Sequence, residues 1–224
     1  AVTDLAAYFD DEITAMPNLV TVGAGGTAST VAGIPFFSAD NSIYTHDVSG
    51  TDDTAQHNAA YGIGAMDAIT TGDQNSALGY NALSANNTGA QNTAMGRLSL
   101  EANTSGDNNT AYGSSTLSAN STADDNTAIG KGSMQSNTTG AANTAVGKDS
   151  LKANTTGTRN LAIGYQAYTA SDTENDNLAI GYQAMTTNTA GGTQNVAIGN
   201  YALDALTSGD NNTAVGHLAM TTHT

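Results

Sequence analysis

The chain has 224 residues, with 5 Lys and Arg against 20 Asp and Glu, so its formal net charge is −15 at pH 7. This charge excludes a nucleic-acid-binding protein, because a groove for phosphates needs a stripe of basic side chains. The chain contains 0 Cys, which excludes disulfide bonds and thiolate metal sites. Much of the 38% hydrophobic share is Ala, which predicts a thin core and a regular arrangement of small residues.

Residues 1–57 form an N-terminal region with 8 of the carboxylates and no Lys or Arg. Asp4 is placed to cap a short helix that Pro17 ends, and Leu19 to Val22 is expected to form a strand. We interpret this region as an adaptor or cap, which either docks the protein on a particle or shields the edge of the first repeat unit. Its acidity indicates a basic docking partner.

Residues 58–224 contain the pentad Asn-x-Ala-x-Gly ten times, at intervals of 17 residues except for one of 18. A full unit reads Asn-Thr-Ala-h-Gly-x-x-(Ser/Ala)-Leu-x-x-Asn-Thr-Thr-Gly-x-x, where h is apolar. Its glycines, asparagines and threonines disfavour helix, and its apolar positions do not follow a 3.6-residue period. We therefore predict an all-β fold, in which this domain is a ten-unit parallel β-solenoid, or β-roll, of 17-residue coils.

The asparagine that opens each unit is interpreted as structural. Amides stacked about 4.8 Å apart along a solenoid form a hydrogen-bonded ladder that satisfies buried polar groups. A repeated ion site is the less favoured interpretation, because carboxylates do not recur at a fixed position of the unit. The predicted ladder consists of Asn58, Asn75, Asn92, Asn109, Asn126, Asn143, Asn160, Asn177, Asn195 and Asn212.

Alternation along a strand places positions one, three and five of the pentad on one face and positions two and four on the other. Position three is always Ala and position five always Gly, so this face is expected to approach another surface closely, either another chain or its own coil. The predicted trimer or close-packing face contains Ala94, Ala111, Ala128, Ala145, Ala162 and Ala179. Positions four and nine are predicted to form the apolar core, with Leu78, Ile129, Val146, Ile163, Ile180, Ile198, Leu83, Leu100, Leu117 and Leu151.

Units such as Asn75-Ser-Ala-Leu-Gly-Tyr and Asn160-Leu-Ala-Ile-Gly-Tyr resemble the head repeats of trimeric autotransporter adhesins and the similar repeats of tailed-bacteriophage tail-fibre proteins. The longer unit, with its Asn-Thr-Thr-Gly segment, is more similar to the phage variants. The resemblance covers residues 58–224 and implies a homotrimeric fibre of parallel β-rolls.

On this resemblance we expect a structural fibre protein of a virion, a phage tail fibre or spike that extends toward the host cell surface and helps to attach to it. The expected partners are further copies of the chain in a homotrimer, a baseplate, tail or capsid protein bound through residues 1–57, and a host surface receptor. The expected location is the virion or, alternatively, the bacterial surface. Neither nucleic acid nor membrane insertion is expected, since no run approaches about 18 consecutive apolar residues.

Two alternatives stay open. The chain is either a virion protein or the head domain of a bacterial outer-membrane trimeric adhesin, and the acidic N-terminus, which lacks the basic start of a secretory signal, favours the virion. An ice-binding β-solenoid is a minor alternative, indicated by Thr at position two in Thr93, Thr110, Thr127, Thr144 and Thr213. Because the last unit stops at Thr224, we expect the native polypeptide to continue.

Catalytic chemistry is not expected, because catalysis needs unlike groups that converge on one point. His46, His57, His217 and His223 share no spacing with Asp, Glu or Ser that indicates a base, a triad or a metal site. Adjacent acids such as Asp124 and Asp125 point to opposite faces of a strand and do not form an acid/base pair. We predict no enzyme activity, no cofactor and no metal.

Overall fold

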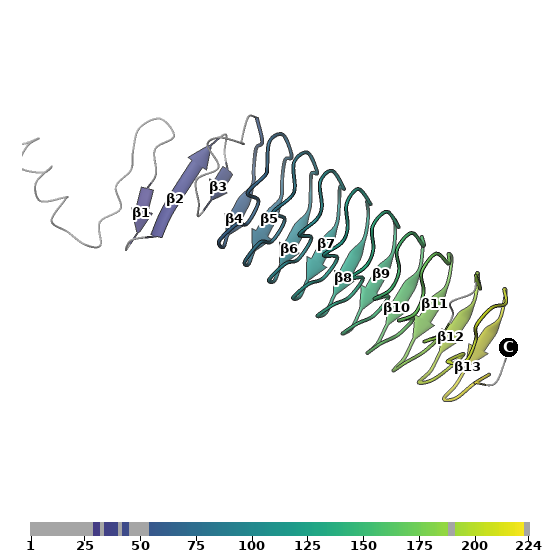
Figure 1. Ribbon diagram of the computed structural model, residues 1–224. Coiled ribbons are helices and arrows are strands. Elements are labelled where there is room, and N and C mark those ends of the chain that lie inside the picture. Colours follow the sequence, from purple (N-terminus) through teal and green to yellow (C-terminus); the bar gives the residue numbers. More distant parts are fainter. Residues whose placement is uncertain (1–28, 32–33, 40–41, 45–53, 188–190, 222–224) are drawn as a thin grey trace, which may run out of the picture.

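The computed structural model describes residues 29–31, 34–39, 42–44, 54–187 and 191–221. Within these residues the protein is all-β, without helix, and its strands form one 13-stranded sheet in sequence order. Figure 1 shows the coils of the repeat stacked one after another into a rod. The helix expected after Asp4 and the strand expected at Leu19 to Val22 lie outside the described residues.

Three strands precede the repeat: β1 (Ser29–Val31), β2 (Ile34–Ala39) and β3 (Ser42–Tyr44). β2 pairs antiparallel with both β1 and β3. β3 then runs parallel to the first repeat strand and pairs Ile43 with Ala59. These three strands therefore continue the solenoid sheet, and β3 covers the edge of its first strand.

The repeat supplies ten parallel strands, one from each unit, and equivalent residues pair in register. Ala128, for example, lies between Ala111 and Ala145 of the neighbouring coils. The predicted parallel β-solenoid is confirmed. Its strands are β4 (Ala59–Tyr61), β5 (Ser76–Leu78), β6 (Thr93–Met95), β7 (Thr110–Tyr112), β8 (Thr127–Ile129), β9 (Thr144–Val146), β10 (Leu161–Ile163), β11 (Leu178–Ile180), β12 (Val196–Ile198) and β13 (Thr213–Val215).

Each coil turns at residues with left-handed backbone conformations. Non-glycine residues at positions seven, nine and seventeen recur in this region, as in Ser115, Leu117 and Asp125 with φ of 55°, 50° and 60°. Such conformations are uncommon for side chains, and here hydrogen bonds between successive coils support them. The N–H of Leu117, for example, donates to the carbonyl of Ser133 over 3.1 Å.

Position five needs glycine for two reasons. Its φ lies between 123° and 142° in all ten units, a region that side chains rarely adopt. In addition, a β-carbon on Gly147 would overlap the carbonyl oxygen of Gly164 in the next coil. The sheet can therefore be stacked this closely only where position five lacks a side chain.

The interior of the coil is filled by small residues from the strand and larger ones from the turn opposite. Position nine contributes the large buried side chains, and Leu83, Leu100, Leu117 and Leu151 have no exposed surface. These four were correctly predicted as core. Across the narrow interior they share one continuous cluster with the alanines of position three.

The structure distinguishes the two strand faces. The alanines Ala94, Ala111, Ala128, Ala145, Ala162 and Ala179 have no exposed surface within a single chain, so of the two surfaces considered for this close-packing face it is the chain's own coil that they contact. The prediction for position four is wrong. Position four points out of the coil instead of into the core, and Leu78, Ile129, Ile163 and Ile198 are 38–44% exposed. Val146 and Ile180 share this outer face and are partly exposed. A 17-residue coil is too thin to hold large side chains from both the strand and the opposite turn.

Gly147→Ala is expected to lower the free energy of unfolding by about 1–3 kcal/mol more than Gly216→Ala. Both glycines occupy position five with similar φ, 134° and 130°, but an added β-carbon at Gly216 meets only Ala219, at 4.0 Å. Chemical denaturation followed by circular dichroism measures the difference. Equal losses would show that the left-handed conformation alone, and not the coil spacing, requires glycine.

Candidate functional site

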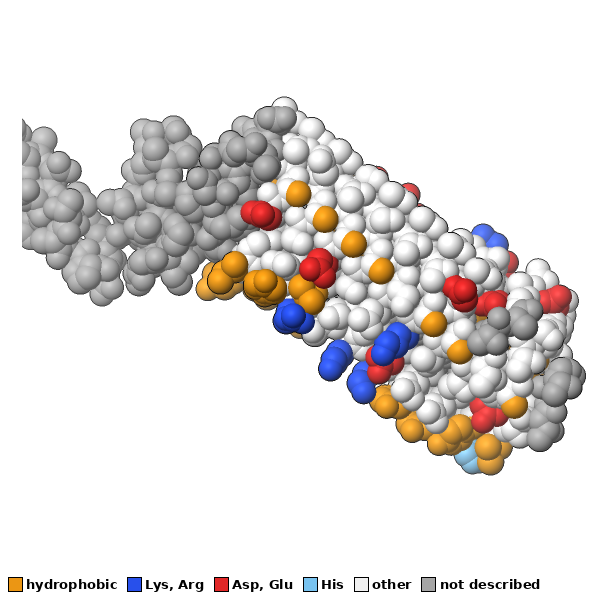
Figure 2. Space-filling view, in the orientation of Figure 1, with side chains coloured by type: hydrophobic (Ala, Val, Ile, Leu, Met, Phe, Trp, Pro, Cys, Tyr) orange, Lys and Arg blue, Asp and Glu red, His pale blue; other side chains and the backbone are white. Residues whose placement is uncertain are grey.

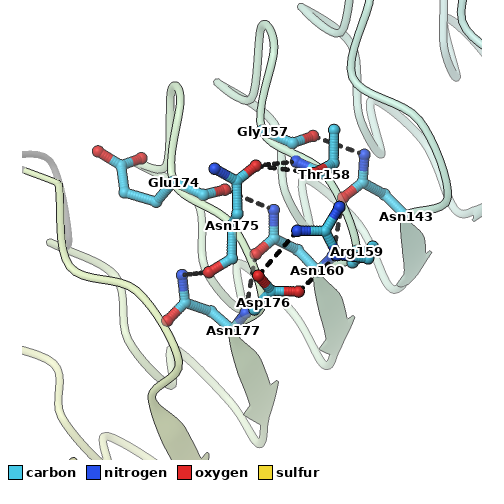
Figure 3. A network of polar contacts seen from close by, with 9 residues as sticks. All are labelled: Asn143, Gly157, Thr158, Arg159, Asn160, Glu174, Asn175, Asp176 and Asn177. Atoms are coloured by element: carbon cyan, nitrogen blue, oxygen red, sulfur yellow. Dashed lines mark hydrogen bonds and ion pairs between the residues drawn. The ribbon is translucent and has the colours of Figure 1, made fainter. Parts of the chain in front are cut away.

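The asparagines of position one form the predicted ladder. The Oδ1 of each accepts the backbone N–H of the equivalent asparagine in the next coil, as in the 2.9 Å bond from Asn143 to Asn126. The Nδ2 of Asn126 donates to the carbonyl of Gly140, also over 2.9 Å. Figure 3 shows two such amide-to-carbonyl bonds, from Asn143 and Asn160. The ladder is confirmed without a break from Asn58 to Asn212.

A second asparagine ladder was missed from the sequence. Its members occupy position twelve, are fully buried, and each amide donates directly to the amide oxygen of the preceding member at 2.8–2.9 Å. The signal was available, since asparagine recurs at this position in five successive units. The members are Asn86, Asn103, Asn120, Asn137 and Asn154.

Glu174 lies at the end of this second ladder, where Ser171 contacts both Asn154 and Glu174. It replaces the glycine of position fifteen, and only 2% of its surface is exposed. Its Oε2 accepts the backbone N–H groups of Asp172 and Thr173 at 2.8 and 3.0 Å, and its Oε1 accepts the N–H of Gly191 at 3.1 Å. Ser171, which occupies position twelve of this coil, donates to the same carboxylate at 3.4 Å. The buried charge is thus satisfied by fixed donors of the turn.

One bidentate ion pair links two successive coils on the surface. The guanidinium of Arg159 donates from Nε and Nη2 to the two carboxylate oxygens of Asp176, at 2.6 and 2.9 Å, as Figure 3 shows. These hydrogen bonds lower the pKa of Asp176 and raise the pKa of Arg159. In the same way, hydrogen bonds from the backbone and hydroxyl of Thr193 lower the pKa of Asp210.

The outer face of the sheet consists of positions two and four. Position two changes along the rod from Thr in β6–β9 to Leu or Val in β10–β12. The outer face is therefore most apolar over the last three of these strands. We call this region the aliphatic patch, and it consists of Leu161, Ile163, Leu178, Ile180, Val196 and Ile198.

Aromatic side chains extend the aliphatic patch around the edge of the sheet. The rings of Tyr165 and Tyr182 are stacked with centroids 5.3 Å apart, and Tyr201 meets Tyr182 edge-on at 5.4 Å. His217 continues the row at 6.1 Å from Tyr201. Burial among these neighbours raises the pKa of Tyr182. Figure 2 shows these apolar side chains along one edge of the rod.

The polar residues considered for chemistry are dispersed along the solenoid. His57 and His217 belong to opposite ends of the described repeat, and His46 and His223 lie outside the described residues. In the part of the chain that the structure describes, no group of three or more His, Cys, Asp or Glu is placed to hold a metal ion. The same part contains no helix that is long and apolar enough to cross a bilayer.

Comparison of the chain with protein-family models, with curated proteins and with solved structures gives no match. The resemblance to adhesin heads and phage fibres therefore stays a prediction from the residues of the repeat. The geometry of the outer sheet face provides the independent basis for a functional proposal.

Asn126→Ala is expected to lower the free energy of unfolding by about 1–3 kcal/mol, because it leaves the buried N–H of Asn143 without a partner. It also removes one of the two amides that donate to the carbonyl of Gly140, the other being that of Asn137. Ser136→Ala is the matched control, since position eleven is Ala in neighbouring coils and Ser136 is exposed. Chemical denaturation measures both variants. A loss below about 0.5 kcal/mol for Asn126→Ala, the usual range of surface substitutions, would contradict the structural role of the ladder.

Asp176→Asn is expected to flatten the dependence of stability on pH in the acid range. The pKa of Asp176 is lower in the folded chain, so its contribution is present above the unfolded pKa of about 3.9 and is lost as the pH falls through the folded value. Thermal unfolding between about pH 5 and pH 2 measures the effect, and Arg159→Gln should produce the same flattening. Parallel curves for wild type and Asp176→Asn would contradict this assignment.

Proposed function

We propose that the protein is a structural fibre protein, whose copies associate side by side through the outer face of the parallel sheet. The observation that carries the proposal is the aliphatic patch on β10–β12, where Ile163 and Ile198 are each 38% exposed in the single chain. Contiguous apolar surface of this kind marks an interaction site. The interior of the coil is already filled by its own residues, so the patch needs another surface to cover it.

The form of the molecule supports a fibre. Ten parallel strands stacked in one direction make a rod, and nine steps of about 4.8 Å give it a length of about 43 Å. Every coil presents the same two positions on the outer face, so several copies can be in contact along the whole rod. A homotrimer is the assembly that the resemblance of the repeat to adhesin heads and phage fibres implies.

The setting we propose is a virion appendage, a phage tail fibre or spike that helps to attach the particle to its host. Residues 1–57, with 8 carboxylates and no Lys or Arg, supply an acidic docking region for a baseplate, tail or capsid protein. The exposed turn around Asp172 and Thr173 supplies a candidate contact for a host receptor. The alternative is an adhesin head, which uses the same rod on a cell surface, and microscopy of labelled particles and cells distinguishes the two.

Ile163→Glu is expected to convert the associated protein into monomers, because it places a charge within the aliphatic patch. Thr156→Glu is the matched control, since it adds the same charge at the exposed position fourteen, away from the sheet face. Sedimentation equilibrium measures the mass of wild type and both variants. A wild-type protein that stays monomeric at high micromolar concentration would overturn the proposal.

Ice binding remains a second candidate, favoured by a row of hydroxyls that the sequence analysis overlooked. Position fourteen carries an exposed Thr or Ser in seven successive coils: Thr71, Thr88, Ser105, Thr122, Thr139, Thr156 and Thr173. The adjacent hydroxyls of position thirteen are held by bonds to the next coil, as from Thr138 to the carbonyl of Thr155 at 2.9 Å. Thermal hysteresis of the purified protein, lost in Thr122→Lys, would favour this candidate over a fibre role.

A further inference from the structure

The two edges of the sheet carry opposite charges over its central strands. We call position six, just after the strands, the basic edge, where Arg97, Lys131 and Lys148 are exposed. Figure 2 shows blue side chains in line along this edge, between two apolar stretches. We call positions sixteen and seventeen, just before β5–β8, the acidic edge, with its carboxylates at Asp73, Asp107, Asp124 and Asp125.

These opposite charges do not meet within one chain. Asp125 and Lys131 flank the two ends of β8, so the strand lies between them. Within the described residues, Arg97 and Lys131 form no ion pair, although Arg97 lies 6.0 Å from the ring centroid of Tyr80. The charged side chains of both edges are therefore available to pair with another molecule.

Other charges near the two edges are paired within the chain. Asp149 lies 3.5 Å from the ammonium group of Lys148 and 3.1 Å from that of Lys152. On the opposite edge, Arg159 is bound by Asp176. Around β6–β8, Asp107 and Asp124 each accept one backbone N–H through Oδ1, but they and Asp125 form no ion pair within the described residues. The cations without an ion pair there are Arg97 and Lys131.

We propose that the basic edge of one copy pairs with the acidic edge of the next copy, and that both copies point in the same direction along the rod. This inference rests on the proposed association through the outer sheet face. A rotation axis parallel to the rod brings unlike edges together at the same coil, so that Lys131 of one copy meets Asp125 of the next. An axis parallel to the strands reverses one rod and brings like edges together, which opposes association.

The axial positions of the charges agree with this arrangement. Asp124, Asp125 and Lys131 all flank β8 and therefore lie at the same level along the rod. Asp107 precedes β7, which is one coil, or about 4.8 Å, from the strands that Arg97 and Lys131 follow. The same direction also places each aliphatic patch against its equivalent over the full length of the rods. Reversal of fully overlapping rods would instead place it against β5–β7, where position two is Ser or Thr. Because exposed ion pairs contribute little affinity, the charged edges select direction and register while the apolar face holds the copies together.

A charge-swap experiment tests the pairing. Lys131→Glu and Asp125→Arg are each expected to lower the association constant about five-fold per contact, and the double variant is expected to recover most of the loss. Arg159 already occupies the position equivalent to Asp125, with φ of 56° against 60°, so the turn accepts this substitution. Sedimentation equilibrium at low salt measures association, and the differences should shrink at about 1 M salt, where screening acts within about 3 Å.

A matched pair separates edge pairing from net charge. Lys131→Gln and Gln91→Glu each make the net charge of the chain more negative by one unit. Lys131→Gln removes a cation from the basic edge, whereas Gln91→Glu adds a carboxylate just before β6, the strand that Arg97 follows. Lys131→Gln is expected to weaken association about two-fold or more, and Gln91→Glu is expected to strengthen it by a similar factor. Equal weakening by both would overturn the proposal.

The outcomes distinguish this inference from the proposed function. In one outcome, wild type associates and Ile163→Glu is monomeric, but the association constant of the charge-swapped double variant is no higher than its two single changes predict. The edge pairing is then wrong, and the apolar association stands. If wild type is monomeric under all conditions, the association itself is wrong. Circular dichroism of each variant confirms that the solenoid is folded.

Discussion

The short distance between successive coils is the constraint on which the rest of the structure depends. Parallel pairing sets it at about 4.8 Å, and at this distance the backbone of one coil almost touches the next. Position five must then be glycine, as the closeness of Gly147 to Gly164 shows. The same distance lets the amide of one asparagine reach the backbone of its equivalent in the next coil, so the polar groups buried by stacking are satisfied by the stacking itself.

A thin coil has consequences for both of its surfaces. Position-nine side chains such as Leu117 fill the interior, and the strand opposite can add only the methyl group of residues such as Ala128. The larger apolar side chains of the strand are therefore turned outward, where the chain cannot cover them. The small side chains inside the coil and the apolar side chains available for association outside it thus have the same origin, the thinness of the coil. Side-by-side assembly offers these outward side chains the burial that their own coil lacks.

The sequence was sufficient to predict the period, the parallel solenoid and the first asparagine ladder, since each follows from strict recurrence. Alternation in the pentad also separated the two strand faces correctly, but it does not say which face is inside. That choice depends on the turn opposite, where left-handed residues such as Ser115 and Leu117 bring position nine inward, and their conformation has no sequence signature. Glu174 was missed for a related reason, because its partners are backbone groups that only the folded turn brings together.

The irregular coil after Glu174 has a further consequence. The interval from Asn177 to Asn195 contains one residue more than the others, yet β12 resumes the register and pairs Ala197 with both Ala179 and Ala214. Local errors are thus absorbed within a single unit and do not propagate along the rod. The length of such a rod therefore changes in fixed steps. Gain or loss of one whole unit by recombination would lengthen or shorten it by about 4.8 Å and would leave the contacts between the remaining coils unchanged.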